Sequence, residues 1–155
     1  MHIRKSLASV RHPFPTVPAA VKSIVFVDDE APYTELMSMM LAHHLGCPVH
    51  SFTHPAQALA HLAGLDAAVI VTDYHMPQLD GIAFIREAAK LAPAAVFVMI
   101  TGHNLAAEED NLCRLGRLKG FLSKPFGWRI LAEEIVRVWP DPASAPALAP
   151  GSPTT

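Results

Sequence analysis

The fold of this chain is decided by the stretch Val69-Ile70-Val71-Thr72-Asp73-Tyr74-His75-Met76-Pro77-Gln78-Leu79-Asp80-Gly81. The apolar, β-branched run that ends here is typical of a strand buried on both faces, as in a parallel sheet. Asp73 follows that run directly, at the edge of the sheet where open α/β folds bind their ligands. An isolated aspartate after a strand is more often a turn or capping residue. The rest of the chain therefore decides the role of Asp73.

The composition predicts one globular domain. The chain has 155 residues, of which 51% are hydrophobic and 17% are charged, enough for one core but not for two ordinary domains. A formal net charge of −2 offers no basic surface for nucleic acid. No apolar run approaches the roughly 20 residues that span a bilayer, and the N-terminus lacks the apolar core of a signal peptide. We expect a cytoplasmic protein that binds neither nucleic acid nor membrane, with Cys47 and Cys113 as free thiols.

Proline-rich segments flank the expected domain. Residues 1–21 contain three prolines and no sustained periodicity, which predicts an extended or disordered arm. Residues 140–155 are rich in proline and alanine, which predicts a disordered tail. The domain is therefore expected at residues 22–139. No output domain fits after Val138, so we expect a stand-alone unit.

Strand and helix patterns alternate five times within the domain. The predicted strands are residues 23–27, 49–52, 67–72, 94–101 and 120–123. The predicted helices are residues 32–45, 55–63, 81–92, 105–115 and 126–139. Gly46 ends the first helix, Thr53 is predicted to cap the second, and Pro93 stops the third. This alternation predicts an α/β fold in which helices cover both faces of a five-stranded parallel sheet.

Polar side chains stand at the ends of four of these strands: Asp28 and Asp29, Asp73, Thr101 and Lys124. In a parallel sheet these ends lie along one edge, so the side chains are expected to converge. Three carboxylates repel one another unless a cation offsets them, and Mg²⁺ prefers such oxygen ligands. A lysine and a threonine hydroxyl can both contact a phosphoryl group. The chemistry indicated is a carboxylate that accepts a phosphoryl group beside a metal ion.

These residues resemble the receiver domain of two-component response regulators. The resemblance also includes Met76-Pro77, Asp80-Gly81 and Lys124-Pro125-Phe126, and covers about residues 22–138. It implies a flavodoxin-like fold with strand order 2-1-3-4-5. It also implies a phosphoacceptor that catalyses only its own phosphorylation and dephosphorylation.

The resemblance assigns the metal site and the source of the phosphate. Asp73 would be the phosphoacceptor, and its phosphoryl group would come from a histidine on a sensor kinase or phosphotransfer protein. Mg²⁺ (or Mn²⁺) would be held by Asp28, Asp29, Asp73 and the backbone carbonyl of His75.

The resemblance also assigns the switch. Thr101 would contact the phosphoryl group and Lys124 would pair with it, through a cis Lys124-Pro125 bond. Gly102 is the small residue that keeps the site open. Phe121 would move inward as Thr101 turns toward phosphate, changing the face made by the fourth helix, fifth strand and fifth helix. That face would bind an unknown target protein or a second copy of the chain.

Two histidines depart from what the resemblance leads us to expect. His75 and His103 lie two residues after Asp73 and Thr101, where side chains flank the entry of the hydrolytic water. The hypothesis is that they set the phosphate lifetime, in a direction that the sequence does not give.

Other readings stay open. The chain is an adaptor whose phosphorylated face binds a target, or a phosphorelay intermediate or phosphate sink, or an inactive pseudo-receiver. A metal-dependent phosphatase with an aspartyl-phosphate intermediate is disfavoured, because His75 replaces the general-acid aspartate of those enzymes.

A group of histidines and one cysteine suggests a zinc site, but its spacing matches no common pattern of zinc ligands. This group, called the zinc-like set below, consists of His43, His44, Cys47, His50 and His54. Trp128 and Trp139 are predicted to be partial core or interface anchors.

Overall fold

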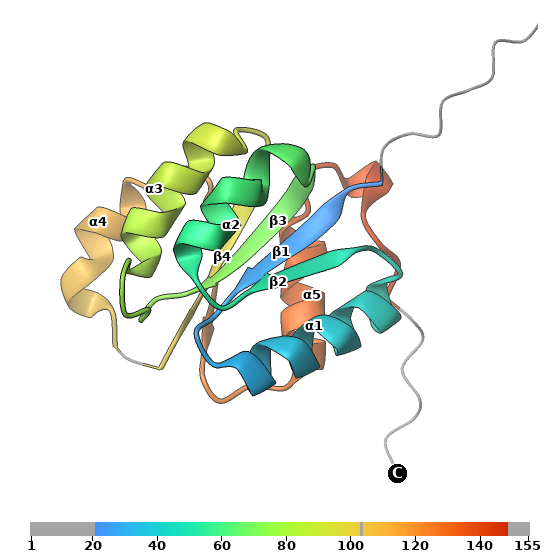
Figure 1. The fold of residues 1–155 in the computed structure, drawn as a ribbon, viewed down its shortest axis with the longest axis horizontal. Helices are drawn as coiled ribbons and strands as arrows, with labels where there is room; N and C mark the ends of the chain where they lie inside the picture. The colour runs from blue at the N-terminus through green and yellow to red at the C-terminus, as the bar shows by residue number, and fades with distance from the viewer. Residues whose placement is uncertain (1–20, 103, 149–155) are drawn as a thin grey trace, which may run out of the picture.

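Five parallel strands form one sheet in the order β2-β1-β3-β4-β5 in the computed structural model (Figure 1). The structure describes residues 21–102 and 104–148. The strands are β1 (Ser23–Val27), β2 (Val49–Phe52), β3 (Ala67–Asp73), β4 (Val96–Thr101) and β5 (Leu118–Ser123). The predicted α/β class and strand order are confirmed.

Helices cover both faces of this sheet (Figure 1). One face is covered by α1 (Ala31–Leu45) and α5 (Trp128–Val138), and the other by α2 (Pro55–His61), α3 (Gly81–Leu91) and α4 (Glu109–Cys113). The three central strands β1, β3 and β4 are thus buried on both sides, which explains why they are apolar almost throughout. Gly46 ends α1 with a φ of 64°, a left-handed conformation that glycine adopts without steric cost.

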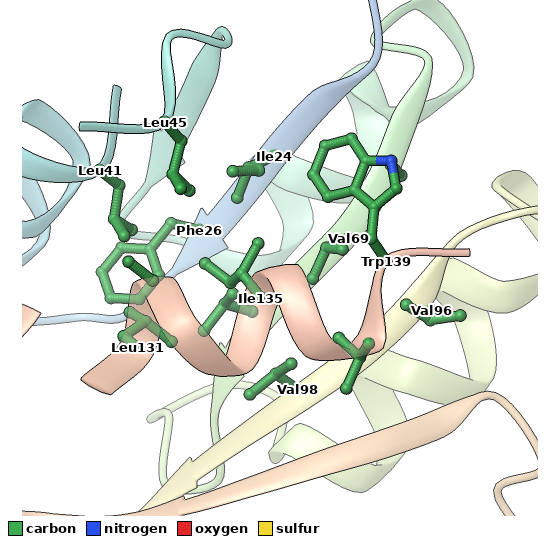
Figure 2. Packing of buried hydrophobic residues seen from close by; sticks show 14 of the residues in the cluster. Ile24, Phe26, Leu41, Leu45, Val69, Val96, Val98, Leu131, Ile135 and Trp139 are labelled. Carbon is green, nitrogen blue, oxygen red and sulfur yellow. The ribbon is translucent and has the colours of Figure 1, made fainter. Parts of the chain in front are cut away.

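Alternate strand residues build two separate cores. Ile24 and Phe26 of β1 point toward α1 and α5, whereas Val25 and Val27 point toward α2 and α3; all four are fully buried. Figure 2 shows the first core, in which Leu131 and Ile135 of α5 lie against the sheet. The two cores fix the strands in register and so fix the edge at which they end.

The helix predicted at residues 105–115 is present but shorter than expected. A 3₁₀ turn at Ala106–Glu108 is followed by the five-residue α4, which buries no residue. The segment offers the core only leucines, and Leu105, Leu112 and Leu115 are partly buried. Short helices are marginal without packing of an apolar face, so this segment does not sustain a longer one.

Several predicted boundaries differ from the structure. β5 begins two residues earlier than predicted because Leu118 already pairs with Phe97. β4 begins two residues later, at Val96, and α5 begins at Trp128 instead of residue 126. The second helix closes with a 3₁₀ turn after His61. Such one- or two-residue differences are usual at element ends.

The capping role predicted for Thr53 is wrong. His54 occupies the N-cap position of α2, and no side chain caps that helix. The Thr53 hydroxyl instead lies 3.0 Å from Nδ1 of His54. Pro55 takes the first helical position, where its missing N–H costs little, so the helix begins there and Thr53 stands one residue before the N-cap.

The C-terminal tail is ordered at its beginning, contrary to the prediction. A 3₁₀ turn forms at Pro142–Ser144, with Asp141 accepting a hydrogen bond from the backbone N–H of Ala143 (3.1 Å). The Trp139 indole N–H donates to the Ser144 hydroxyl (3.3 Å), and its ring is buried in the first core. The predicted arm and the rest of the tail, residues 1–20 and 149–155, lie outside the described residues. Within the described ranges, no helix is both long and apolar enough to cross a membrane.

Candidate functional site

The carboxyl ends of β1, β3, β4 and β5 meet at one edge of the sheet. The register pairs Val27 with Thr72, Asp73 with Ile100, and Thr101 with Ser123. Residues that directly follow these strands therefore lie side by side, as the sequence predicted.

Three carboxylates converge at this edge. One oxygen from each of Asp28, Asp29 and Asp73 lies within 4.8 Å of the other two. Asp28 and Asp73 are buried, whereas Asp29 is exposed. In the described part of the chain this is the one group of histidine, cysteine and acidic side chains arranged to hold a metal ion. An all-oxygen set with one open side suits a hard divalent cation such as Mg²⁺.

Lys124 brings a positive charge into the same site. Its Nζ lies 3.1 Å from Oδ2 of Asp28 and 3.4 Å from Oδ2 of Asp73. The backbone N–H of Lys124 donates to the Thr101 carbonyl (2.8 Å), which ties the residue to the end of β4. The Lys124-Pro125 peptide bond is cis, as predicted.

The electrostatics of the site are unbalanced, with three carboxylates against one ammonium group. Burial raises the pKa of Asp73, and the Asp28 carboxylate raises it further, while Lys124 and the His75 backbone N–H act the other way. For Lys124, burial lowers the pKa, but the surrounding carboxylates, led by Asp28, outweigh it and the net shift is upward. Excess negative charge in a buried site is the condition that a divalent cation relieves.

A hydrogen-bonded turn holds the loop between β1 and α1. The backbone N–H of Glu30 donates to Oδ1 of Asp28 (3.0 Å). The buried Thr34 hydroxyl lies 2.9 Å from the carbonyl oxygens of both Asp28 and Glu30. These bonds fix the Asp28 side chain and its backbone. Sequence reasoning missed Thr34, although its place in the first turn after the acidic pair was a usable signal.

Tyr33 is a second residue that sequence reasoning missed. Its ring centroid lies 5.0 Å from Nζ of Lys124. Burial raises the pKa of Tyr33; Lys124 opposes that rise, and the acidic residues of the site add to it. The signal for Tyr33 was weak, because an aromatic residue in the first turn of a helix is usually core.

The loop after β3 is fixed from both sides. The Tyr74 N–H donates to the Ile100 carbonyl, and the Gly81 N–H donates to the Tyr74 carbonyl, each at 2.8 Å. A Cβ on Gly81 would stand 2.7 Å from the Asp73 carbonyl oxygen, which explains why glycine is needed at this position. Asp80 caps α3 by accepting from the Ala83 N–H (2.8 Å). The loop thus holds Asp73 in place.

The residues assigned to the switch lie around two hollows. One, of about 420 Å³, lies between the buried Thr101 and Phe121 and is also lined by the exposed Gly102. The other, of about 620 Å³, lies between α4 and β5 and is lined by Leu112 and Leu118. Phe121 lines both and is 46% exposed, so its side chain lies between them.

The histidines singled out in the sequence do not form one site. His75 is exposed and meets the Tyr74 ring edge-on at 4.9 Å between centroids. His103 lies outside the described residues. The zinc-like set forms no metal site within residues 21–102 and 104–148, where the acidic group alone meets the geometry of such a site. His44 instead packs edge-on against Trp128 (4.9 Å between centroids).

Comparison with known proteins agrees with this fold and site. Residues 24–136 match the sequence profile of the family described as the response regulator receiver domain. Two curated regulators of Rhizobium meliloti (strain 1021) are similar over one region. The C4-dicarboxylate transport transcriptional regulatory protein DctD is 30% identical over 108 residues, covering 70% of this chain and 23% of that protein. The transcriptional regulatory protein FixJ is 28% identical over 115 residues, covering 74% and 55%.

A solved structure extends the comparison to three dimensions. The Vibrio cholerae chemotaxis protein CheY4 aligns with a TM-score of 0.69 and 23% identity, over 77% of this chain and 99% of that one. This likeness concerns the fold. The chain spans only about a quarter to half of the length of the two curated regulators. The profile match covers most of the 155 residues, so the chain belongs to the response regulator receiver domain family.

Proposed function

We propose that this chain is a phosphoacceptor receiver in which Asp73 takes a phosphoryl group from a histidine of a partner kinase or phosphotransfer protein. A carboxylate oxygen of Asp73 attacks phosphorus, the P–N bond breaks, and the imidazole keeps the electron pair. The observation that carries the proposal is the convergence of Asp28, Asp29 and Asp73 within 4.8 Å, beside the Lys124 ammonium. As a CheY-like receiver domain, the chain is not a classical enzyme.

The proposal includes a divalent metal, Mg²⁺ or Mn²⁺. Asp28, Asp29, Asp73 and the backbone carbonyl of His75 would hold it, and the oxygen-only donor set and the raised pKa of Asp73 support the fit. A bound metal supplies positive charge that offsets the phosphoryl oxygens. Asp73 itself remains the nucleophile, and burial limits the access of water to it.

Lys124 and Thr101 are the proposed phosphate contacts. The Lys124 ammonium already lies next to Asp73, so a phosphoryl group on that carboxylate would take over the ion pair. The Thr101 hydroxyl stands at the end of the neighbouring strand, and Gly102 leaves the entry open. Pro125 fixes the backbone that follows Lys124. These roles rest on the resemblance and on the proximity just described.

Output is proposed to run through Phe121. Its inward movement into the 420 Å³ hollow beside Thr101 would remove one wall of the larger hollow between α4 and β5. The face formed by α4, β5 and α5 would thereby change shape. Phosphorylation of Asp73 would thus produce a different protein-binding surface.

The lifetime of the phosphate is proposed to depend on His75 and His103. The exposed His75 ring, two residues after Asp73 in the sequence, packs against the Tyr74 ring. A double variant, His75→Asn with His103→Ala, is expected to change the decay rate of the phosphoprotein. An unchanged decay would remove this part of the proposal.

Two outputs remain as alternatives within the proposal. An adaptor would bind a target protein, or a second copy of itself, only when phosphorylated. A relay or sink would pass the phosphate from Asp73 back to a second histidine protein, and fast reverse transfer would favour it. An inactive pseudo-receiver and a phosphatase are the remaining options. The cytoplasmic location, the stand-alone organisation and the domain limits 22–139 stay predictions.

Beryllofluoride, a phosphoryl mimic, tests the proposal without a partner. With Mg²⁺ present, we expect amide NMR signals of Thr101, Phe121 and α4 to shift together, because the mimic would occupy the position of phosphate on Asp73. The Asp73→Asn variant is expected to show no such shift. Signals that stay in place in the wild type would contradict the proposed switch.

A further inference from the structure

The Lys124 ammonium is bounded by an aromatic ring as well as by carboxylates. Its Nζ lies 3.1 Å from Asp28, 3.4 Å from Asp73 and 5.0 Å from the centroid of the Tyr33 ring. A cation at this distance from an aromatic ring is attracted by the electrons of the ring. The ring is therefore a third neighbour of the ammonium, in addition to the two carboxylates.

The ring of Tyr33 is held in its position by the fold. Tyr33 lies in the first turn of α1, and its half-buried ring packs against the fully buried Phe26 of β1 (6.1 Å between centroids, 52° between planes). The first turn of α1 is fixed in turn by the Thr34 hydroxyl, which bonds the carbonyls of the preceding loop. Lys124, in contrast, is a long flexible side chain that loses rotamer freedom when it is held.

The charged partners of Lys124 change during the proposed reaction. A divalent metal would compete with Lys124 for Asp28 and Asp73, and phosphorylation would convert the Asp73 carboxylate into an acyl phosphate. The metal would weaken both ion pairs that hold the ammonium, and phosphorylation would replace the pair with the Asp73 carboxylate by one with the phosphoryl group. The Tyr33 ring carries no charge that metal or phosphate would neutralise, so its contact with the ammonium survives both events.

We propose that Tyr33 is a positioning residue, whose ring keeps the Lys124 ammonium directed at Asp73 while the carboxylates exchange their partners. The inference rests on the proposed function, because it gives Tyr33 a role in the same reaction. The face of the ring is what the role requires. The phenol hydroxyl is not required, and phenylalanine serves equally well.

The test compares Tyr33→Phe, which keeps the ring, with Tyr33→Leu, which keeps only apolar volume. The first readout is the rate at which intact protein gains a phosphoryl group from acetyl phosphate and Mg²⁺. Tyr33→Leu is expected to react about fivefold more slowly, the order of effect of one partly buried cation–π contact, and Tyr33→Phe at the wild-type rate. Arg129→Leu, which removes a similar contact with Trp128 outside the site, serves as control and is expected to leave the rate unchanged.

A second readout separates positioning from plain packing. The Cε protons of Lys124, next to Nζ, lie near the face of the Tyr33 ring. Their NMR signals are therefore expected upfield of the corresponding signals of Lys22 and Lys119. The shift is expected to persist with Mg²⁺ and beryllofluoride, to persist in Tyr33→Phe, and to vanish in Tyr33→Leu. A general loss of packing would slow the reaction without a shift specific to Lys124.

Several results would overturn the inference. These are a wild-type rate in Tyr33→Leu, equal losses in Tyr33→Leu and Tyr33→Phe, or a Lys124 shift that disappears when beryllofluoride binds. Wild-type protein that gains no phosphoryl group would instead overturn the proposed function itself. The Lys124 signal without ligands would then still report whether the ring holds the ammonium.

Discussion

At the scale of single residues, Asp73 is held in a strained electrostatic state. It is buried beside Asp28, and Lys124 offsets only part of the repulsion. A carboxylate in this state gains more from a bound metal ion than an exposed one would. The same features that cost the apo protein stability therefore favour the binding of the metal on which the proposed reaction depends.

This strain predicts a pH-dependent effect of Asp73→Asn on the unfolding of metal-free protein. The folded-state pKa of Asp73 lies above its ordinary value of 3.8, because of burial and Asp28. Between those two pKa values the folded state binds more protons than the unfolded state, so wild-type stability falls as pH rises through that window. The asparagine side chain of the variant does not titrate. The variant is therefore expected to be more stable than wild type at neutral pH, with the difference shrinking on acidification.

The measurement is urea unfolding of both proteins in EDTA, from neutral to acidic pH. Adding Mg²⁺ is expected to stabilise the wild type more than the variant, since the metal binds the folded state. A variant that is less stable than the wild type at every pH would contradict the assigned repulsion.

The residues of the site were predictable only in part. Asp28, Asp29, Asp73, Thr101 and Lys124 could be found because each stands at or directly after a strand end, and parallel strands end at one edge. Tyr33 and Thr34 sit inside the first turn of α1, where the direction of a side chain depends on how the helix packs. Their positions do not follow from where the strands end, so their contacts could be identified only in the structure.

At the scale of elements, α2 and α3 differ in how their first turns are capped. Asp80 accepts a hydrogen bond from the Ala83 N–H at the start of α3. Thr53 makes no such bond at the start of α2. The prediction for Thr53 failed because α2 begins at Pro55, as predicted, which makes His54 the residue at the N-cap.

This difference predicts unequal costs for two alanine substitutions. Asp80→Ala is expected to lower the free energy of unfolding by about 1 kcal/mol, the usual cost of losing an N-cap. Thr53→Ala, the matched control, is expected to stay within about 0.5 kcal/mol of wild type, as is usual for surface changes. Chemical denaturation measures both. Equal losses would mean that the assignment of the caps is wrong.

The fourth helix shows where local pattern fails. The sequence predicts a helix at residues 105–115, a polar and acidic segment that contains the leucines Leu105, Leu112 and Leu115. The acidic residues between them leave little apolar surface to pack, and only Glu109–Cys113 forms α-helix. The short α4 lies next to a hollow lined by Phe121. The α4 part of the proposed output face is therefore weakly packed against the rest of the domain.

At the scale of the whole molecule, the fold could be predicted because every level of the sequence agrees. Buried strands, short connections and helix ends all favour one parallel sheet, whose order is β2-β1-β3-β4-β5. The ordered start of the tail could not be predicted, because Trp139 anchors it by burial in the α1–α5 core. Composition alone predicts disorder for a proline-rich segment, because it does not show which side chains of that segment pack against the domain.

The central claim is that Asp73 accepts a phosphoryl group with the help of a divalent metal. The most direct measurement is intact mass after incubation of the protein with acetyl phosphate and Mg²⁺. Wild-type protein is expected to gain the mass of one phosphoryl group, and neither Asp73→Asn nor wild type in EDTA is expected to gain it. Wild-type protein that gains no mass, or an Asp73→Asn variant that gains the same mass, would contradict the claim.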